Sequence, residues 1–104
     1  MEVIREIAAA ELSDCIKAAD NAIVLYHKEL CPHCKNMEKV LAKFSKKAAG
    51  VEFYGVDSNE EPIEMDKYGV ERVPSLLFVK NGEVVHCKTG LMNPKELAAL
   101  YSSL

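Results

Sequence analysis

The residues best suited to chemistry in this chain are two cysteines separated by two residues, in the run Cys31-Pro32-His33-Cys34. Thiols at this spacing can close a small disulfide ring, and a ring that opens and closes exchanges two electrons with another disulfide. The first residues, Met1 to Arg5, lack the basic start and long apolar stretch of an export signal. In the reducing compartment this predicts, the pair is expected to cycle between dithiol and disulfide. A purely structural pair of thiols is the alternative.

Length and composition narrow the class of protein. The chain has 104 residues, of which 49% are hydrophobic, so we expect one domain over residues 1–104 with its own core. Its 13 basic and 16 acidic side chains give a net charge of −3, whereas a nucleic-acid binder usually carries a basic face. No apolar run approaches the roughly 20 residues of a membrane span. These features predict a soluble, monomeric, cytoplasmic protein that binds neither nucleic acid nor membranes.

The elements that position the cysteines follow from apolar patterning, which alternates between strands and helices. Strands are expected over Val3–Ile7, Ala22–His27, Val51–Val56, Ser75–Val79 and Glu83–Lys88. Helices are expected to carry Leu12, Cys15, Ile16 and Ala19, to run from Cys31 to near Gly50, to span Pro62–Tyr68, and to follow Asn93. The order β-α-β-α-β-α-β-β-α predicts an α/β fold, a mixed central sheet flanked by helices on both faces.

Two short sequence patterns predict local structure in the C-terminal half of the chain. Asn81-Gly82 between two apolar runs predicts a hairpin, because both residues tolerate positive φ. Asn93, Pro94 and Glu96 have the spacing of a helix cap with its capping-box partner.

This order of elements, with a Cys-x-x-Cys after the second strand, resembles the thioredoxin family. The stretches that carry the resemblance are Asp20–Val24, Cys31–Lys35, Asp57, Lys67–Val70, Val73–Ser75, Lys80–Glu83 and Thr89-Gly90. The resemblance implies a thioredoxin fold and a thiol–disulfide oxidoreductase that exchanges electrons with protein disulfides. It implies a thioredoxin reductase-like partner that recharges the pair, and neither a cofactor nor a metal.

Five positions depart from the family pattern. Pro32-His33 replaces the usual Gly-Pro and is similar to the dipeptide of periplasmic disulfide oxidases and of atypical thioredoxins from anaerobic bacteria. Leu30 stands where the family has Trp, Leu25 where it has a buried Asp, and Lys39 where it has a helix-kinking Pro.

Within this framework the roles in the active site can be assigned. Cys31, at the positive end of a helix, is the expected nucleophile, and Cys34, one turn further along the apolar stripe, is the expected resolving thiol. Pro32 suits the first helical turn. His33 is the tuning residue, because a hydrogen bond or positive charge beside the Cys31 thiolate favours the charged form.

The expected effect of His33 on the redox potential has a definite size and sign. Lowering the pKa of Cys31 by one unit stabilises the reduced form by about 1.4 kcal/mol at neutral pH. That raises the potential of a two-electron couple by about 30 mV. We therefore expect a more oxidising potential than that of a Gly-Pro thioredoxin; the alternative is an exposed histidine without influence.

The resemblance also implies a substrate-docking surface. The Val73-Pro74 bond is cis in the family and lies against the cysteine pair, so the backbone of Val73 is expected to pair with an extended substrate segment. Leu30 and Gly90 are expected to supply an apolar rim. An ordinary trans proline at a strand entry is the alternative.

Two questions stay open at the level of sequence. With Leu25 in place of an acid, the proton of Cys34 goes to solvent or to a nearby side chain, and nothing chooses between His27, Lys28 and Glu29. A metal or cluster site built on Cys31, His33 and Cys34 and a non-catalytic binding module remain the competing functions. Cys15 and Cys87 are expected to be structural.

Overall fold

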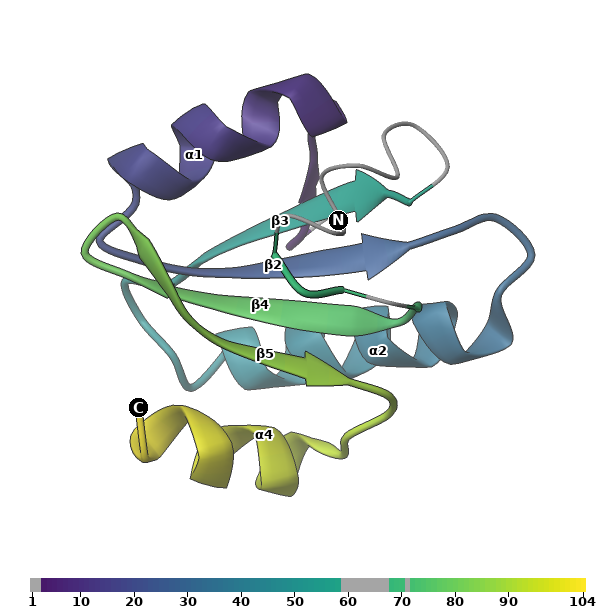
Figure 1. Ribbon diagram of the computed structural model, residues 1–104. Coiled ribbons are helices and arrows are strands. Elements are labelled where there is room, and N and C mark those ends of the chain that lie inside the picture. Colours follow the sequence, from purple (N-terminus) through teal and green to yellow (C-terminus); the bar gives the residue numbers. More distant parts are fainter. Residues whose placement is uncertain (1–2, 59–67, 71) are drawn as a thin grey trace.

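The computed structural model of the protein describes residues 3–58, 68–70 and 72–104. Its sheet has five strands in the order β1-β3-β2-β4-β5 (Figure 1). The strands are β1 (Arg5–Glu6), β2 (Asn21–His27), β3 (Glu52–Asp57), β4 (Ser75–Lys80) and β5 (Glu83–Thr89). The described helices are the 3₁₀ turn η1 (Ala9–Glu11), α1 (Leu12–Ala18), α2 (Pro32–Ser45) and α4 (Pro94–Ser102). β1, β3 and β2 run parallel while β4 and β5 are antiparallel, so the predicted mixed sheet is confirmed.

Strand β2 lies at the centre of the sheet and is buried on both faces, which explains its nearly continuous apolar run. Its side chains alternate between two cores. Val24 and Tyr26 belong to the core beneath α1, and Ile23 and Leu25 belong to the core beneath α2 and α4. His27, the last residue of β2, continues the second series.

Helices cover both faces of the sheet, as predicted: α1 lies on one face, and α2 and α4 lie on the other (Figure 1). Met37, Leu41 and Leu97 are fully buried between the last two helices and the sheet. The rings of Phe44 and Tyr101 meet edge to face with centroids 5.5 Å apart, which fixes α4 against α2. α2 is therefore held rigidly on the sheet with its N-terminus at the edge where β2 ends.

The two turn signals of the C-terminal half are confirmed. Asn81 and Gly82 have φ of 54° and 79° in the turn between β4 and β5. Asn93 Oδ1 accepts from the Glu96 N–H at 2.8 Å, and Glu96 Oε1 accepts from the Asn93 N–H at 3.0 Å.

Three predicted elements differ from the structure by more than one residue at an end or are not covered by it; β2, β3, β4 and β5 differ from their predicted bounds by a single residue at one or both ends. The first strand is confined to Arg5–Glu6. α2 ends at Ser45 rather than near Gly50, because the N–H groups of Lys46 and Lys47 bond to carbonyls three residues back and close the last turn early. The helix predicted over Pro62–Tyr68 lies outside the described residues, except for Tyr68.

Candidate active site

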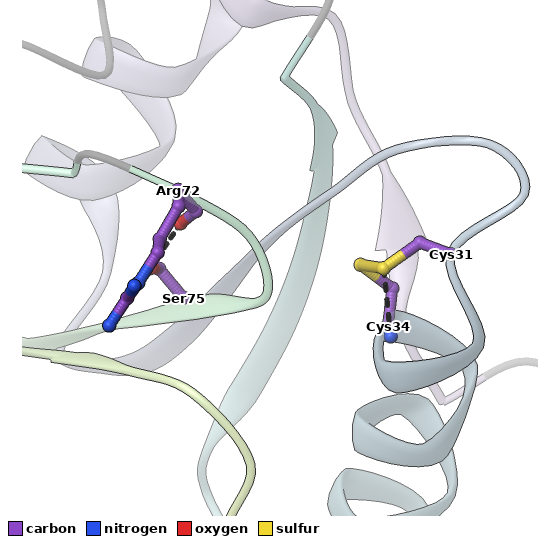
Figure 2. Close-up of a disulfide and its surroundings, with 4 residues drawn as sticks. All are labelled: Cys31, Cys34, Arg72 and Ser75. Carbon is purple, nitrogen blue, oxygen red and sulfur yellow. Dashed lines mark hydrogen bonds between the residues drawn. A yellow bond between two sulfur atoms is a disulfide. The ribbon is translucent and has the colours of Figure 1, made fainter.

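The two cysteines of the motif meet at the N-terminus of α2. Cys31 is the N-cap residue, Pro32 is the first helical residue, and Cys34 lies in the first turn. Cys31 and Cys34 are joined by a disulfide, with Cα atoms 5.2 Å apart (Figure 2). This separation lies within the usual range for bonded cysteines, so the backbone already holds the two sulfurs at reacting distance.

The two sulfurs have unequal surroundings. Cys31 is 8% exposed and Cys34 only 2%, and Cys34 shares the buried side of α2 with Met37 and Leu41. The Cys34 N–H donates to Cys31 Sγ at 3.2 Å. After reduction, this donor and the positive end of the helix favour a thiolate at Cys31. The geometry suits an outer sulfur that attacks and an inner sulfur that resolves.

The other two residues of the motif face outward. Pro32 and His33 are both exposed on the first turn of α2. Pro32 lacks the N–H that would be left unpaired at this position. His33 is placed between the two cysteines, where its ring is open to solvent and to an arriving substrate.

A hollow of about 630 Å³ opens beside the disulfide. It is lined by His27, Lys28, Glu29, Leu30, Cys31, Pro32, Cys34, Lys35 and Glu38. Leu30 stands at its mouth with 98% of its surface exposed and with φ of 55°. An apolar side chain this exposed beside a reactive disulfide can cover an apolar group of a substrate.

The segment before β4 supplies the second part of the predicted site. The Val73-Pro74 bond is cis, as the family resemblance implies. The Gly90 N–H donates to the Pro74 carbonyl at 2.9 Å, so the structure brings these two predicted residues together. Ser75 Oγ donates to the Arg72 carbonyl at 2.6 Å and lies 3.0 Å from Thr89 Oγ1, which ties the segment to β5 (Figure 2).

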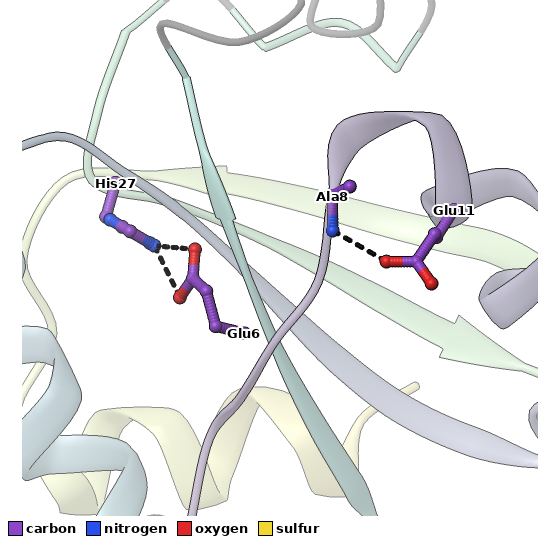
Figure 3. A network of polar contacts seen from close by, with 4 residues as sticks. All are labelled: Glu6, Ala8, Glu11 and His27. Carbon is purple, nitrogen blue, oxygen red and sulfur yellow. Dashed lines mark hydrogen bonds and ion pairs between the residues drawn. The ribbon is translucent and has the colours of Figure 1, made fainter.

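The structure distinguishes the three side chains that sequence left open as partners of Cys34. Lys28 and Glu29 are exposed in the loop after β2. His27 Nε2 lies 2.9 and 2.8 Å from the two carboxylate oxygens of Glu6 (Figure 3). Of the three, His27 is the side chain held in a defined polar contact.

Sequence reasoning missed two acidic residues near the site. Glu38 follows Cys34 by four residues, and this helical spacing was a signal that could have found it. Glu6 is 21 residues from His27 and reaches it through the parallel pairing of β1 with β3. No pattern among neighbouring residues predicts such a pairing.

Cys15 and Cys87 are free and half-buried, away from the motif. Burial raises the pKa of both thiols, and at Cys15 the neighbouring Arg5 opposes the shift. Both are therefore poorer nucleophiles at neutral pH than an ordinary thiol.

The part of the chain that the structure describes contains neither a cluster of metal ligands nor a membrane-spanning helix. No group of three or more His, Cys, Asp and Glu side chains there is arranged to hold a metal ion. None of the helices described is both long enough and apolar enough to cross a bilayer.

The thioredoxin family model matches residues 3–103. This chain belongs to the thioredoxin family. The solution structure of reduced desulfothioredoxin from Desulfovibrio vulgaris Hildenborough is 46% identical, with a TM-score of 0.86 over 100% of both chains. Thioredoxin from Pseudomonas aeruginosa is 33% identical over 83% of this chain and 81% of its own.

Some relatives are much longer than this thioredoxin-family chain. Monothiol glutaredoxin-S11 from Oryza sativa subsp. japonica is 32% identical over 94% of this chain, which spans only 20% of that protein. The chain covers between 20% and 60% of the first curated relatives it matches. Family and fold follow from these comparisons.

Proposed function

We propose that the protein is a thiol–disulfide oxidoreductase that exchanges electrons with protein disulfides through Cys31 and Cys34. One observation carries the proposal: a bonded cysteine pair at the N-terminus of α2, in which the outer residue, Cys31, is 8% exposed and the inner residue, Cys34, is 2% exposed. In the reducing direction the Cys31 thiolate attacks a substrate disulfide and forms a mixed disulfide. Cys34 then attacks Cys31, which releases the reduced substrate and closes the Cys31–Cys34 bond.

The potential of the pair is proposed to be more oxidising than that of a Gly-Pro thioredoxin. His33 is exposed on the first turn of α2 beside Cys31. An imidazole there stabilises the thiolate and therefore the reduced form. A pair with a stabilised reduced form accepts electrons more readily, which suits oxidation or isomerisation of client disulfides as well as their reduction.

Protein substrates are proposed to dock across Leu30, the Val73-Pro74 segment and Gly90. Leu30 offers an exposed apolar side chain, and the contact between Gly90 and Pro74 places the other two parts side by side. The chain is proposed to act in the cytoplasm as a monomeric single domain, and to be recharged by a reductase of the thioredoxin reductase type.

The activity is tested with insulin reduction and with reactivation of scrambled ribonuclease, comparing wild type with Cys31→Ser and Cys34→Ser. Wild type is expected to turn over, and neither variant should. Cys34→Ser should accumulate a mixed disulfide with its substrate, while Cys31→Ser, the matched control, should accumulate none. Failure of wild type in both assays, together with no trapped species, contradicts the proposal.

The potential is tested by titrating the Cys31–Cys34 pair against glutathione. A value more oxidising than that of a Gly-Pro thioredoxin measured in parallel is expected. His33→Ala should move it toward the Gly-Pro value. A wild-type potential at or below the Gly-Pro value rejects this part of the proposal.

A further inference from the structure

The resolving step needs a proton acceptor near Cys34. A thiolate is the nucleophile in thiol–disulfide exchange, so Cys34 must lose its proton before it attacks the mixed disulfide. Cys34 is 2% exposed, so solvent has little direct access to that proton. A neighbouring side chain that takes up a proton near neutral pH would speed this step.

The backbone of β2 aims His27 at the side of the sheet on which Cys34 lies. Side chains along a strand alternate, so His27 follows Ile23 and Leu25 on the face covered by α2. His27, Cys34 and Glu38 line the same hollow beside the disulfide. His27 and Glu38 also line a second hollow, of about 320 Å³, that contains Glu6. His27 and Glu38 therefore border both the hollow beside Cys34 and the hollow that contains Glu6.

Glu6 fixes the hydrogen on the histidine ring. An ionised carboxylate only accepts hydrogen bonds, so Nε2, which faces both Glu6 oxygens, carries a hydrogen and donates it. In the neutral ring Nδ1 is then the atom that accepts a proton. The His27 side chain is 19% exposed and that of Glu6 56%, so the carboxylate meets the ring from the more exposed side (Figure 3).

A glycine in β3 makes room for this contact between His27 and Glu6. Gly55 pairs with both Glu6 and Leu25 in the sheet. A Cβ at Gly55 would lie 2.7 Å from Glu6 Oε1 and 3.4 Å from His27 Nε2. Glycine in the middle of a strand weakens it and commonly marks a close approach, here that of the Glu6 carboxylate.

Other charged groups surround His27, and their chemistry makes them weaker candidates. They are Arg5 and Glu6 of β1, Lys28 and Glu29 after β2, Lys35 and Glu38 of α2, and Asp57 of β3. Lysine and arginine are already protonated at neutral pH, and ordinary carboxylates are weak bases there. An imidazole is the side chain suited to take up and release a proton in this range.

We propose that His27, held by Glu6, accepts the proton that Cys34 loses when it resolves the mixed disulfide; the proposal rests on the function proposed above. The proton passes from Cys34 Sγ across the shared hollow to His27 Nδ1. The Cys34 thiolate attacks Cys31 Sγ, the bond between Cys31 and the substrate sulfur breaks, and the Cys31–Cys34 bond forms. The substrate leaves as a thiolate, the pair is oxidised by two electrons, and His27 returns its proton to solvent.

The test separates the two chemical steps with one equivalent of 5,5′-dithiobis(2-nitrobenzoate) in a stopped-flow instrument. Cys15→Ala and Cys87→Ala are introduced throughout so that only the motif cysteines react. The first release of thionitrobenzoate reports attack by Cys31, and the second reports resolution by Cys34. His27→Gln and Glu6→Gln are compared with His86→Gln, which removes a histidine on β5 as a control.

In His27→Gln the second phase is expected to slow by roughly tenfold or more at neutral pH. Its pH profile should lose the inflection between about pH 5 and 8, the range in which an imidazole takes up a proton. The first phase should stay unchanged, and imidazole added to the buffer should restore the second. Glu6→Gln should slow the second phase to a smaller extent, and His86→Gln should leave both phases as they are.

A second phase in His27→Gln within about twofold of wild type across this pH range overturns the proposal. Should His27→Gln fail to fold, Glu6→Gln and Gly55→Ala, which crowds the His27–Glu6 contact from β3, carry the same test. An unchanged second phase in both overturns it equally. If wild type itself releases no second thionitrobenzoate, the Cys31–Cys34 disulfide does not form and the proposed function fails. This outcome differs from one in which the disulfide forms at a rate that does not depend on His27.

Discussion

Leu30 has both an unfavourable backbone conformation and an unfavourable exposure. Its φ of 55° lies in the left-handed region, which costs a residue with a β-carbon about 1 kcal/mol. Its side chain is 98% exposed, so no buried contact within the protein offsets that cost. The position adjoins Cys31 and lines the hollow beside the disulfide. A strained apolar residue in this place is what the proposed contact with a substrate requires.

Leu30→Asn tests that explanation at the scale of one residue. Asparagine tolerates left-handed φ, so the free energy of unfolding should stay constant or rise slightly. Loss of about 1 kcal/mol of apolar contact should raise KM for a protein disulfide by roughly fivefold, with little change for a small disulfide. Steady-state kinetics with both substrates measure the split. Val85→Thr, at another exposed apolar residue, should leave both KM values unchanged; an unaltered KM in Leu30→Asn argues against docking there.

Cys15 and Cys87 should be slow to react in the reduced protein. Burial raises the pKa of both thiols above that of an ordinary thiol, so a smaller share of each is thiolate at pH 7. Limiting iodoacetamide at pH 7 should therefore label Cys31 first, and peptide mapping should find Cys15 and Cys87 labelled at least roughly tenfold more slowly. The Cys31→Ser variant gives the background rate of the other thiols. Equal labelling of Cys87 and Cys31 in wild type would show that the helix terminus does not activate Cys31.

Between elements, the turn from β4 to β5 holds α1 in place. The Gly82 N–H donates to the Ala19 carbonyl, and the Asn81 N–H donates to the Asp20 carbonyl. A Cβ at Gly82 would lie 2.9 Å from the Lys17 carbonyl oxygen at the end of α1. The hairpin turn therefore touches the backbone of a helix more than 60 residues earlier in the chain, and glycine is needed there for space as well as for φ.

Gly82→Ala and Gly50→Ala separate these two requirements. Both glycines have positive φ, but a Cβ at Gly50 meets no atom within 4 Å. Gly50→Ala should cost about 1 kcal/mol from backbone conformation alone, and Gly82→Ala roughly 2 kcal/mol or more because α1 must also move. Urea unfolding of the oxidised proteins measures both. Equal losses would mean that the contact between the turn and α1 relaxes freely.

The separation along the chain between contacting residues explains which features the sequence predicts and which it does not. The hairpin at Asn81-Gly82 and the cap at Asn93 depend on residues a few positions apart, so local patterns identify them. α2 ends at Ser45 because its last turn closes several residues before Gly50, the residue at which the sequence predicts the end of the helix. The cysteine pair is visible in the sequence because the helix itself brings Cys31 and Cys34 together. The contact of Glu6 with His27 requires the sheet order, which no local pattern contains.

At the scale of the whole molecule, redox state and folding stability are linked. The oxidised and reduced proteins and their unfolded chains form a thermodynamic cycle. If the folded pair is a better oxidant than the same pair in the unfolded chain, the reduced protein is the more stable of the two. A residue that stabilises the reduced folded form raises both the potential and the relative stability of that form. His33 is proposed to act in this way, so its effect should appear in unfolding experiments that contain no redox buffer.

His33→Ala should therefore lower the stability of the reduced protein relative to the oxidised protein. For each unit by which His33 lowers the pKa of Cys31, the difference in unfolding free energy should change by about 1.4 kcal/mol and the potential by about 30 mV. Urea unfolding of each redox form gives the first quantity, and glutathione titration gives the second. Effects of the substitution on the stability of the helix itself occur in both redox forms, so they cancel in the difference between the two unfolding free energies. Asn36→Ala, at an exposed residue further along α2, is the control and should change neither this difference nor the potential. A shift in potential without the matching shift in relative stability would mean that His33 acts on the cysteine pair equally in the folded and the unfolded chain, so that its influence does not depend on the fold.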